Sequence, residues 1–140
     1  ARKNNSSPFD ALLKAKDILV DEKLLQFDLF TKTVMGGLTI NNQMTNRAVK
    51  QANYGKLSVF TAAKEDIYLF KAITDRPFQR DYEDLVTLQQ SGLDWNAIQA
   101  EYEKQVAGTK LEENLRNKLT RLKKQGISNP LIKKLRIKRE

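Results

Sequence analysis

The fold is decided by residues 63–98, AKEDIYLFKAITDRPFQRDYEDLVTLQQSGLDWNAI, where the pattern of the chain becomes helical. Glu65 and Asp66 suit the first turn of a helix, because acidic side chains there complement the helix dipole. Apolar residues then recur at three-residue spacing from Ile67 to Ile73, which predicts one buried helical face.

Proline and glycine divide this stretch into separate helices. Pro77 disfavours helical geometry at the residue before it and predicts the end of the first helix. A second helix is expected from about Asp81 to Ser91, with Gly92 just beyond its end. Asp94 is a suitable N-cap for a third helix.

The residues before this stretch favour strands. Residues 17–20 and 24–30 predict a hairpin, and the apolar second strand is expected inside the sheet. Residues 57–61 predict a third strand, whereas the polar residues 43–52 predict a surface helix with an asparagine as its N-cap. Strands followed by helices predict an α+β fold.

Composition excludes several kinds of site. The chain of 140 residues contains no cysteine and no histidine, so disulfides, thiolate chemistry and histidine general bases are absent. No apolar run approaches the roughly 20 residues of a membrane span, and residues 1–10 do not resemble a signal peptide. We therefore expect a cytoplasmic protein without a membrane partner. The chain begins at Ala1, which indicates a processed product or a fragment.

The net positive charge comes entirely from the C-terminal segment. Residues 110–140 carry eleven basic and three acidic side chains, whereas residues 1–109 carry fourteen of each. A capped helix from about Thr109 to Gly126 and a short helix opened by Pro130 are predicted there. We expect a frayed end at 1–8, a domain at 9–108 and a basic helical extension at 109–140.

Two interpretations of this extension stay open. Its exposed cations could bind RNA, including tRNA, or DNA through phosphates, without stacking, because the extension has no aromatic residue. Alternatively, they form only a solvated helix face. The candidate contacts are Arg116, Lys118, Arg121, Lys123, Lys124, Lys133, Lys134 and Arg136.

A dense group of charges lies around Pro77 and also has two interpretations. In one, Asp81 and Asp84 cap a helix while the cations pair with nearby acids. In the other, the cations bind the phosphates of a nucleotide, with the carboxylates orienting them or holding Mg²⁺. The candidate nucleotide-binding residues are Lys71, Arg76, Arg80, Asp81 and Asp84.

A resemblance favours the nucleotide. Residues 63–98 resemble the C-terminal half of nucleotidyltransferase-fold proteins of archaea and bacteria, including nucleotidyltransferase toxins of abortive-infection systems. In these families a helix carries a lysine, here Lys71, and is followed by Arg-Asp-x-x-Asp, here beginning at Arg80. Upstream, 25-LQFDLFTKTVMGGLTINNQMTNRA-48 resembles the strand that ends in the third metal carboxylate, which places Asp28 in that role.

The resemblance covers about residues 17–107 and implies a small mixed sheet followed by helices. It implies Mg²⁺ and NTP as cofactors, with Asp28 as a catalytic metal ligand, and transfer of a nucleotidyl group to a nucleic-acid or protein acceptor. It also implies an antitoxin protein as a partner. The chain departs from the family because the Gly-Ser turn with Asp-x-Asp is absent. The alternative is therefore a non-catalytic module that binds nucleic acid or a partner through its basic helices.

Overall fold

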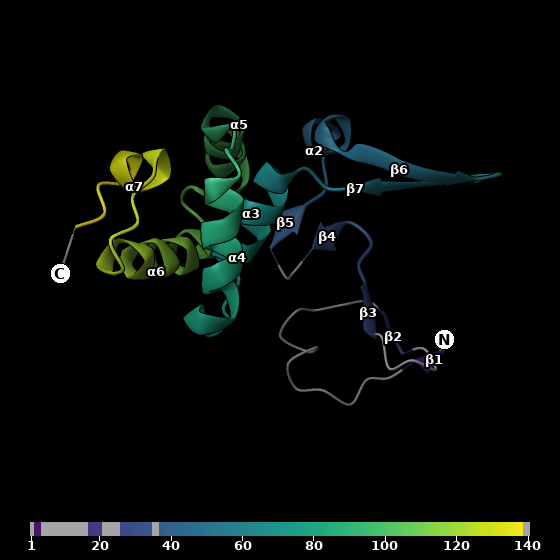
Figure 1. The fold of residues 1–140 in the computed structure, drawn as a ribbon, viewed down its shortest axis with the longest axis horizontal. Coiled ribbons are helices and arrows are strands. Elements are labelled where there is room, and N and C mark those ends of the chain that lie inside the picture. Colours follow the sequence, from purple (N-terminus) through teal and green to yellow (C-terminus); the bar gives the residue numbers. More distant parts are fainter. Residues whose placement is uncertain (1, 4–16, 21–25, 35–36, 139–140) are drawn as a thin grey trace. The chain divides into compact units, whose positions relative to one another are not determined.

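The computed structural model describes residues 2–3, 17–20, 26–34 and 37–138, and side chains from residue 30 onward. The chain divides into two compact units, residues 1–40 and residues 41–140. The predicted α+β class is confirmed, since short strands come first and helices dominate the second unit (Figure 1). None of the described helices is long and apolar enough to cross a membrane.

The first unit contains two small antiparallel sheets. Strand β2 (Asp17–Val20) pairs with both β1 (Arg2–Lys3) and β3 (Gln26–Leu29). The hairpin predicted from these residues is confirmed, but β3 lies at the edge of the described sheet and not inside it. Strands β4 (Thr33–Val34) and β5 (Leu38–Thr39) form the second sheet.

The second unit begins with a short helix and a β-hairpin. Helix α2 (Asn42–Arg47) is capped by the side chain of Asn41, which accepts a hydrogen bond from the amide of Met44 at 2.9 Å. The prediction that this helix continues to residue 52 is wrong. Residues from 49 onward instead form β6 (Val49–Tyr54), paired with β7 (Leu57–Thr61).

The described strands therefore form three separate antiparallel sheets, whereas the resemblance implies one mixed sheet. The hairpin of β6 and β7 extends away from the helices of its unit (Figure 1). All its side chains except Ala52 are exposed, including Tyr54, Leu57 and Phe60.

Helices form the core of the second unit. Helix α3 (Lys64–Ile73) packs on α4 (Phe78–Gln90), α5 (Trp95–Glu101) and α6 (Lys110–Lys124). Helix α5 continues into a π-helical turn, η1 (Tyr102–Val106), and the chain ends in α7 (Pro130–Lys134) and a short segment after it.

The apolar face of α6 is part of this core. Leu115, Leu119 and Leu122 are fully buried, as are Leu69 and Ile73 of α3. Burial of each such side chain contributes roughly 1.5–3 kcal/mol to folding. Helices α6 and α7 thus belong to the same compact unit as the helices before them, and α6 does not need a partner helix to cover its leucines.

Buried charges join α2 to the helices. Arg47 donates to Asp66 of α3 at 2.7 Å and to Glu101 of α5 at 2.9 Å. Both carboxylates are almost fully buried, and Asn41 donates to Glu101 at 3.0 Å. The pKa of Glu101 would be raised by burial, but hydrogen bonds from Gln105, Arg47 and Asn41 lower it below its usual value.

Candidate nucleic-acid interface

The charges around Pro77 meet in a buried cluster centred on Asp81. The side chain of Asp81 is fully buried in the first turn of α4, which begins at Phe78 with Pro77 as its N-cap residue. Lys118 of α6 donates from Nζ to Oδ2 of Asp81 at 2.5 Å. Arg76 donates from Nε to the same oxygen at 3.3 Å and from its terminal nitrogen to Oδ1. Asp81 is therefore an ion-pair anchor, and its predicted role as an N-cap is wrong.

Two cations keep Asp81 ionised in this buried position. Burial alone would raise the pKa of this carboxyl group, but the hydrogen bonds from Lys118 and Arg76 outweigh that effect and lower the pKa below its usual value. Both carboxylate oxygens of Asp81 are occupied by protein donors. The positive charge of Arg76 and Lys118 is correspondingly directed at Asp81 and not at an external phosphate.

The three donors of the Lys118 ammonium are all used inside the protein. Besides Asp81, Nζ donates to the carbonyl oxygen of Lys71 at 2.9 Å and to Oγ1 of Thr74 at 3.1 Å. The Lys118 side chain is only 5 % exposed. Lys118 was predicted as a nucleic-acid contact, but the structure places it in the interior, bridging α6 to the end of α3.

The other predicted nucleotide-binding residues lie at the edge of this cluster. Lys71 donates from Nζ to Oδ2 of Asp84 at 2.8 Å, and the Asp84 side chain is 56 % exposed. Arg80 is exposed on α4. The structure thus brings Lys71, Arg76, Asp81 and Asp84 together, as the resemblance implies, and mutual pairing is their main interaction.

Asp28 lies in β3, where its backbone is opposite Ile18 of β2. Its side chain falls outside the described residues, so its role as a metal ligand stays a prediction. No group of three or more acidic side chains that could hold a metal ion occurs in the described part of the chain. The described residues of this chain therefore do not fit an Mg²⁺ site by themselves.

The predicted basic residues of the C-terminal helices differ in their surroundings. Arg116 lies 3.6 Å from Glu112 and donates to the carbonyl oxygen of Leu135 at 3.0 Å. Lys134 pairs with Glu103 at 2.5 Å. Lys123 is half-buried and donates to a backbone carbonyl. These interactions tie α6, α7 and η1 together.

A second group of basic residues faces solvent. Arg121, Lys133 and Arg136 are exposed, and within the described ranges no carboxylate lies at ion-pairing distance from any of them. Lys138 shares these properties and was not among the predicted contacts. Because no carboxylate of the described residues neutralises their positive charge, these side chains are well suited to contact phosphate groups.

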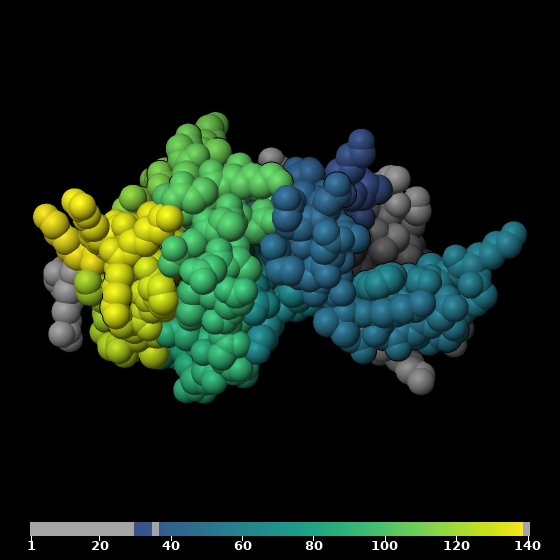
Figure 2. Space-filling view, turned by 90° about the horizontal axis from the view of Figure 1, so that it is seen from above, coloured from purple at the N-terminus to yellow at the C-terminus, as the bar shows by residue number. Residues whose placement is uncertain are grey.

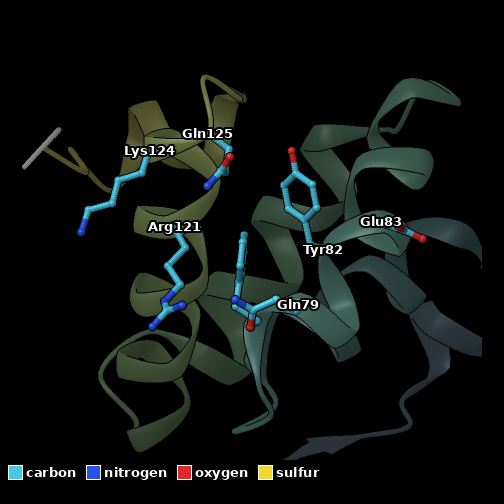
Figure 3. Close-up of a pocket in the computed structure, with 7 residues that line it drawn as sticks. Gln79, Tyr82, Glu83, Arg121, Lys124 and Gln125 are labelled. Atoms are coloured by element: carbon cyan, nitrogen blue, oxygen red, sulfur yellow. The ribbon is translucent and has the colours of Figure 1, made fainter.

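A groove between α4 and α6 adjoins Arg121. It encloses about 580 Å³ and is lined by Phe78, Gln79, Tyr82, Glu83, Arg121, Lys124 and Gln125. In Figure 3, Tyr82 projects from α4 toward Gln125 of α6, with Arg121 lower on the same helix. The rings of Phe78 and Tyr82 lie 5.2 Å apart, and the Arg121 guanidinium lies 5.8 Å from the centre of the Phe78 ring.

A neighbouring hollow of about 370 Å³ shares Phe78 and Arg121 with the groove as lining residues. Arg76, Asn114 and Asn117 also line this hollow. The basic extension contains no aromatic residue of its own, but its α6 packs beside an aromatic pair on α4. The helical spacing of Phe78 and Tyr82 can be seen in the sequence. The packing of α6 beside these two residues cannot be predicted from it.

No family model, curated protein or solved structure matches this chain. The resemblance of residues 17–107 to nucleotidyltransferase-fold proteins accordingly stays a prediction.

Proposed function

We propose that the chain binds nucleic acid through a cationic face on α6, α7 and the segment after α7. This cationic face consists of Arg121, Lys124, Lys133, Lys134 and Arg136. The observation that carries the proposal is that Arg121, Lys133 and Arg136 are exposed and, within the described ranges, have no carboxylate partner. The cations of the Asp81 cluster, in contrast, are neutralised inside the protein.

Phosphate contacts by such a face give affinity without sequence preference. Each basic side chain that neutralises a phosphate releases condensed counterions, so affinity falls as salt concentration rises.

The β6–β7 hairpin provides a control surface for the cationic face, because it also carries exposed lysines, Lys50 and Lys56. Figures 1 and 2 show this hairpin at the opposite end of the second unit from α7.

The proposal is tested with a short fluorescently labelled RNA strand and the full chain. We expect the triple variant Arg121→Gln, Lys133→Gln, Arg136→Gln to lose about ten-fold or more in affinity at low salt, because three phosphate contacts are removed. The matched control neutralises three other exposed lysines, Lys50, Lys56 and Lys64.

An equal loss of affinity in the two triple variants would contradict the proposed face, since overall net charge alone would then explain binding. No measurable binding of the unmodified chain at low salt would contradict nucleic-acid binding altogether. Circular dichroism of each variant verifies that the helices are retained.

Nucleotidyl transfer is a second candidate function. The supporting observation is that Lys71, Arg76, Asp81 and Asp84 form one cluster, as the resemblance to nucleotidyltransferase-fold proteins implies. In the reaction, an acceptor hydroxyl oxygen bonds to the α-phosphorus of an NTP and pyrophosphate leaves. In this chain the resemblance gives Asp28 as the metal ligand and Lys71 as the contact to the triphosphate, whereas the family's Asp-x-Asp is absent from the sequence.

This second candidate is tested by incubating the full chain with Mg²⁺, an RNA acceptor and an NTP labelled at the α-phosphate. Label on the RNA or on the protein, lost in Lys71→Gln, would support it. Absence of labelled product together with unchanged NTP binding in Lys71→Gln would contradict it.

A further inference from the structure

We propose that the groove between α4 and α6 binds one nucleoside phosphate unit of an unpaired strand, with its base against Tyr82 and its phosphate at Arg121. The inference rests on the proposed nucleic-acid binding and adds a preference for unpaired nucleotides to it. The observations behind it are the size of the groove, the aromatic pair on one wall and, on the other, the Arg121 guanidinium, which pairs with no carboxylate of the described residues.

The groove has the dimensions of a small-molecule site. Its volume of about 580 Å³ falls within the range of roughly 300–1,000 Å³ typical of ligand pockets. It is formed by side chains of two helices that are both anchored in the core, α4 through Leu85 and α6 through Leu119 and Leu122. A site on two packed helices is rigid, which favours one defined orientation of the ligand.

One wall of the groove supplies a stacking surface. Tyr82 is half-buried, so part of its ring is accessible, whereas the neighbouring Phe78 is 9 % exposed. The two rings are tilted by 49° with their centres 5.2 Å apart, so the Tyr82 ring packs against Phe78. A base can stack on such a ring whatever its identity, because every base has a π-face.

Arg121 and two glutamines supply charge and hydrogen-bonding groups around the groove. Arg121 is held over the Phe78 ring and has no carboxylate partner among the described residues. A guanidinium fixed in this way presents its planar set of donors to a phosphate. Gln79 and Gln125 flank the groove from α4 and α6 with amides that can donate to or accept from the edges of a base (Figure 3).

The arrangement favours an unpaired base over a paired one. In a duplex the faces of each base are covered by its neighbours, and a base must leave the stack before it can lie on Tyr82. The cationic face contacts phosphates of either form. The groove should therefore distinguish single strands from duplexes, whereas the cationic face does not.

The test compares variants of the full chain in titrations with a labelled single strand and with the duplex of the same sequence. We expect Tyr82→Leu to lose about ten-fold in affinity for the single strand and little for the duplex, since stacking contributes only to the former. The matched control is Tyr54→Leu, which alters a tyrosine that is 69 % exposed on the hairpin.

A second measurement uses the unmodified chain and therefore does not depend on whether a variant folds. A strand containing 2-aminopurine should lose fluorescence on binding to the unmodified chain, because stacking quenches that base. Arg121→Lys, which keeps the charge but not the planar fork, should weaken single-strand binding and leave the duplex affinity near that of the unmodified chain.

The outcomes separate this inference from the function on which it rests. If the unmodified chain binds strand and duplex equally, with no quenching and no difference between the two tyrosine variants, the groove inference is overturned while nucleic-acid binding stands. If the chain binds neither form at low salt, the proposed function is overturned, and the groove inference with it.

A free mononucleotide carries the same nucleoside phosphate chemistry as the unit in a strand. Adenosine monophosphate is therefore titrated against the strand complex as a competitor. Displacement only at concentrations far above the dissociation constant of the strand assigns the groove to a strand. Displacement at similar concentrations, lost in Tyr82→Leu, would overturn the assignment to a strand in favour of a free nucleotide.

Discussion

Lys118 and Arg121 are three residues apart on α6, and the structure uses them in opposite ways. The ammonium of Lys118 is buried against Asp81, with each of its donors bound to protein. The guanidinium of Arg121 is exposed beside a groove and has no carboxylate partner in the part of the chain that is described. A high density of basic residues in a sequence therefore does not by itself identify a binding site, because a buried acid on another helix can neutralise some of those residues.

The largest effect is expected on the buried side of this comparison. Replacing Lys118 by methionine leaves Asp81 buried with Arg76 as its remaining strong partner, and breaking a buried pair costs roughly 3–5 kcal/mol. We expect this loss in the free energy of unfolding measured with urea. Lys133→Met, which alters an exposed lysine, should change it by no more than about 0.5 kcal/mol. Equal effects of the two variants would show that the Asp81 cluster is not a structural anchor.

Acid should weaken the same cluster. Because the pKa of Asp81 is lower in the folded protein than in the unfolded chain, this group contributes stability above the ordinary carboxyl pKa of about 4. That contribution is lost as pH falls through the folded pKa. Urea unfolding from pH 6 down to pH 3 should therefore show a steeper loss of stability in the unmodified chain than in Asp81→Asn. Parallel profiles would contradict the assignment of a lowered pKa to Asp81.

A smaller effect is expected at the edge of the cluster. The pair of Lys71 and Asp84 is partly exposed, and pairs of this kind contribute roughly 0.2–1 kcal/mol. Lys71→Gln should consequently lower the free energy of unfolding by about 1 kcal/mol or less. A loss as large as that of Lys118→Met would mean that Lys71 belongs to the buried anchor.

A similarly small effect on stability is expected on the exposed side. Arg121→Gln removes a cation over the Phe78 ring, an interaction that contributes about 0.5–1 kcal/mol at exposed positions. The variant should thus unfold within about 1 kcal/mol of the unmodified chain while losing affinity for RNA. A large loss of stability without any change in RNA affinity would reverse the roles that we assign to Arg121 and Lys118.

Local features of this fold can be predicted from the sequence because neighbouring residues determine them. Asn41, Asp94 and Asn129 each cap a helix through a side chain that accepts a backbone N–H two or three residues ahead. Gly92 and Gly126 have positive φ values where helices end, a backbone conformation that glycine adopts easily. These signals predict the order of α3, α4, α5, α6 and α7, the starts of α5, α6 and α7 and the approximate ends of α3, α4 and α6.

Features that depend on distant residues were not predictable in the same way. The partners Asp81 and Lys118 are separated by 37 residues, and nothing near either position indicates the other. Strand β6 has a polar sequence without clear alternation and is a strand because it pairs with β7. Tyr82 and Arg121 meet across a groove only because α4 packs on α6.

Our main proposal is that the exposed cations Arg121, Lys133 and Arg136 bind RNA phosphates, whereas Lys71 and the cations that pair with Asp81 do not. Its most direct test is the slope of the logarithm of RNA affinity against the logarithm of salt concentration. For a single strand, each phosphate contact contributes about 0.7 to the magnitude of this slope. We predict that neutralising Arg121, Lys133 and Arg136 together lowers that magnitude by about 2, whereas Lys71→Gln leaves it unchanged. An unchanged slope in the triple variant, or a loss of slope in Lys71→Gln, would contradict the account.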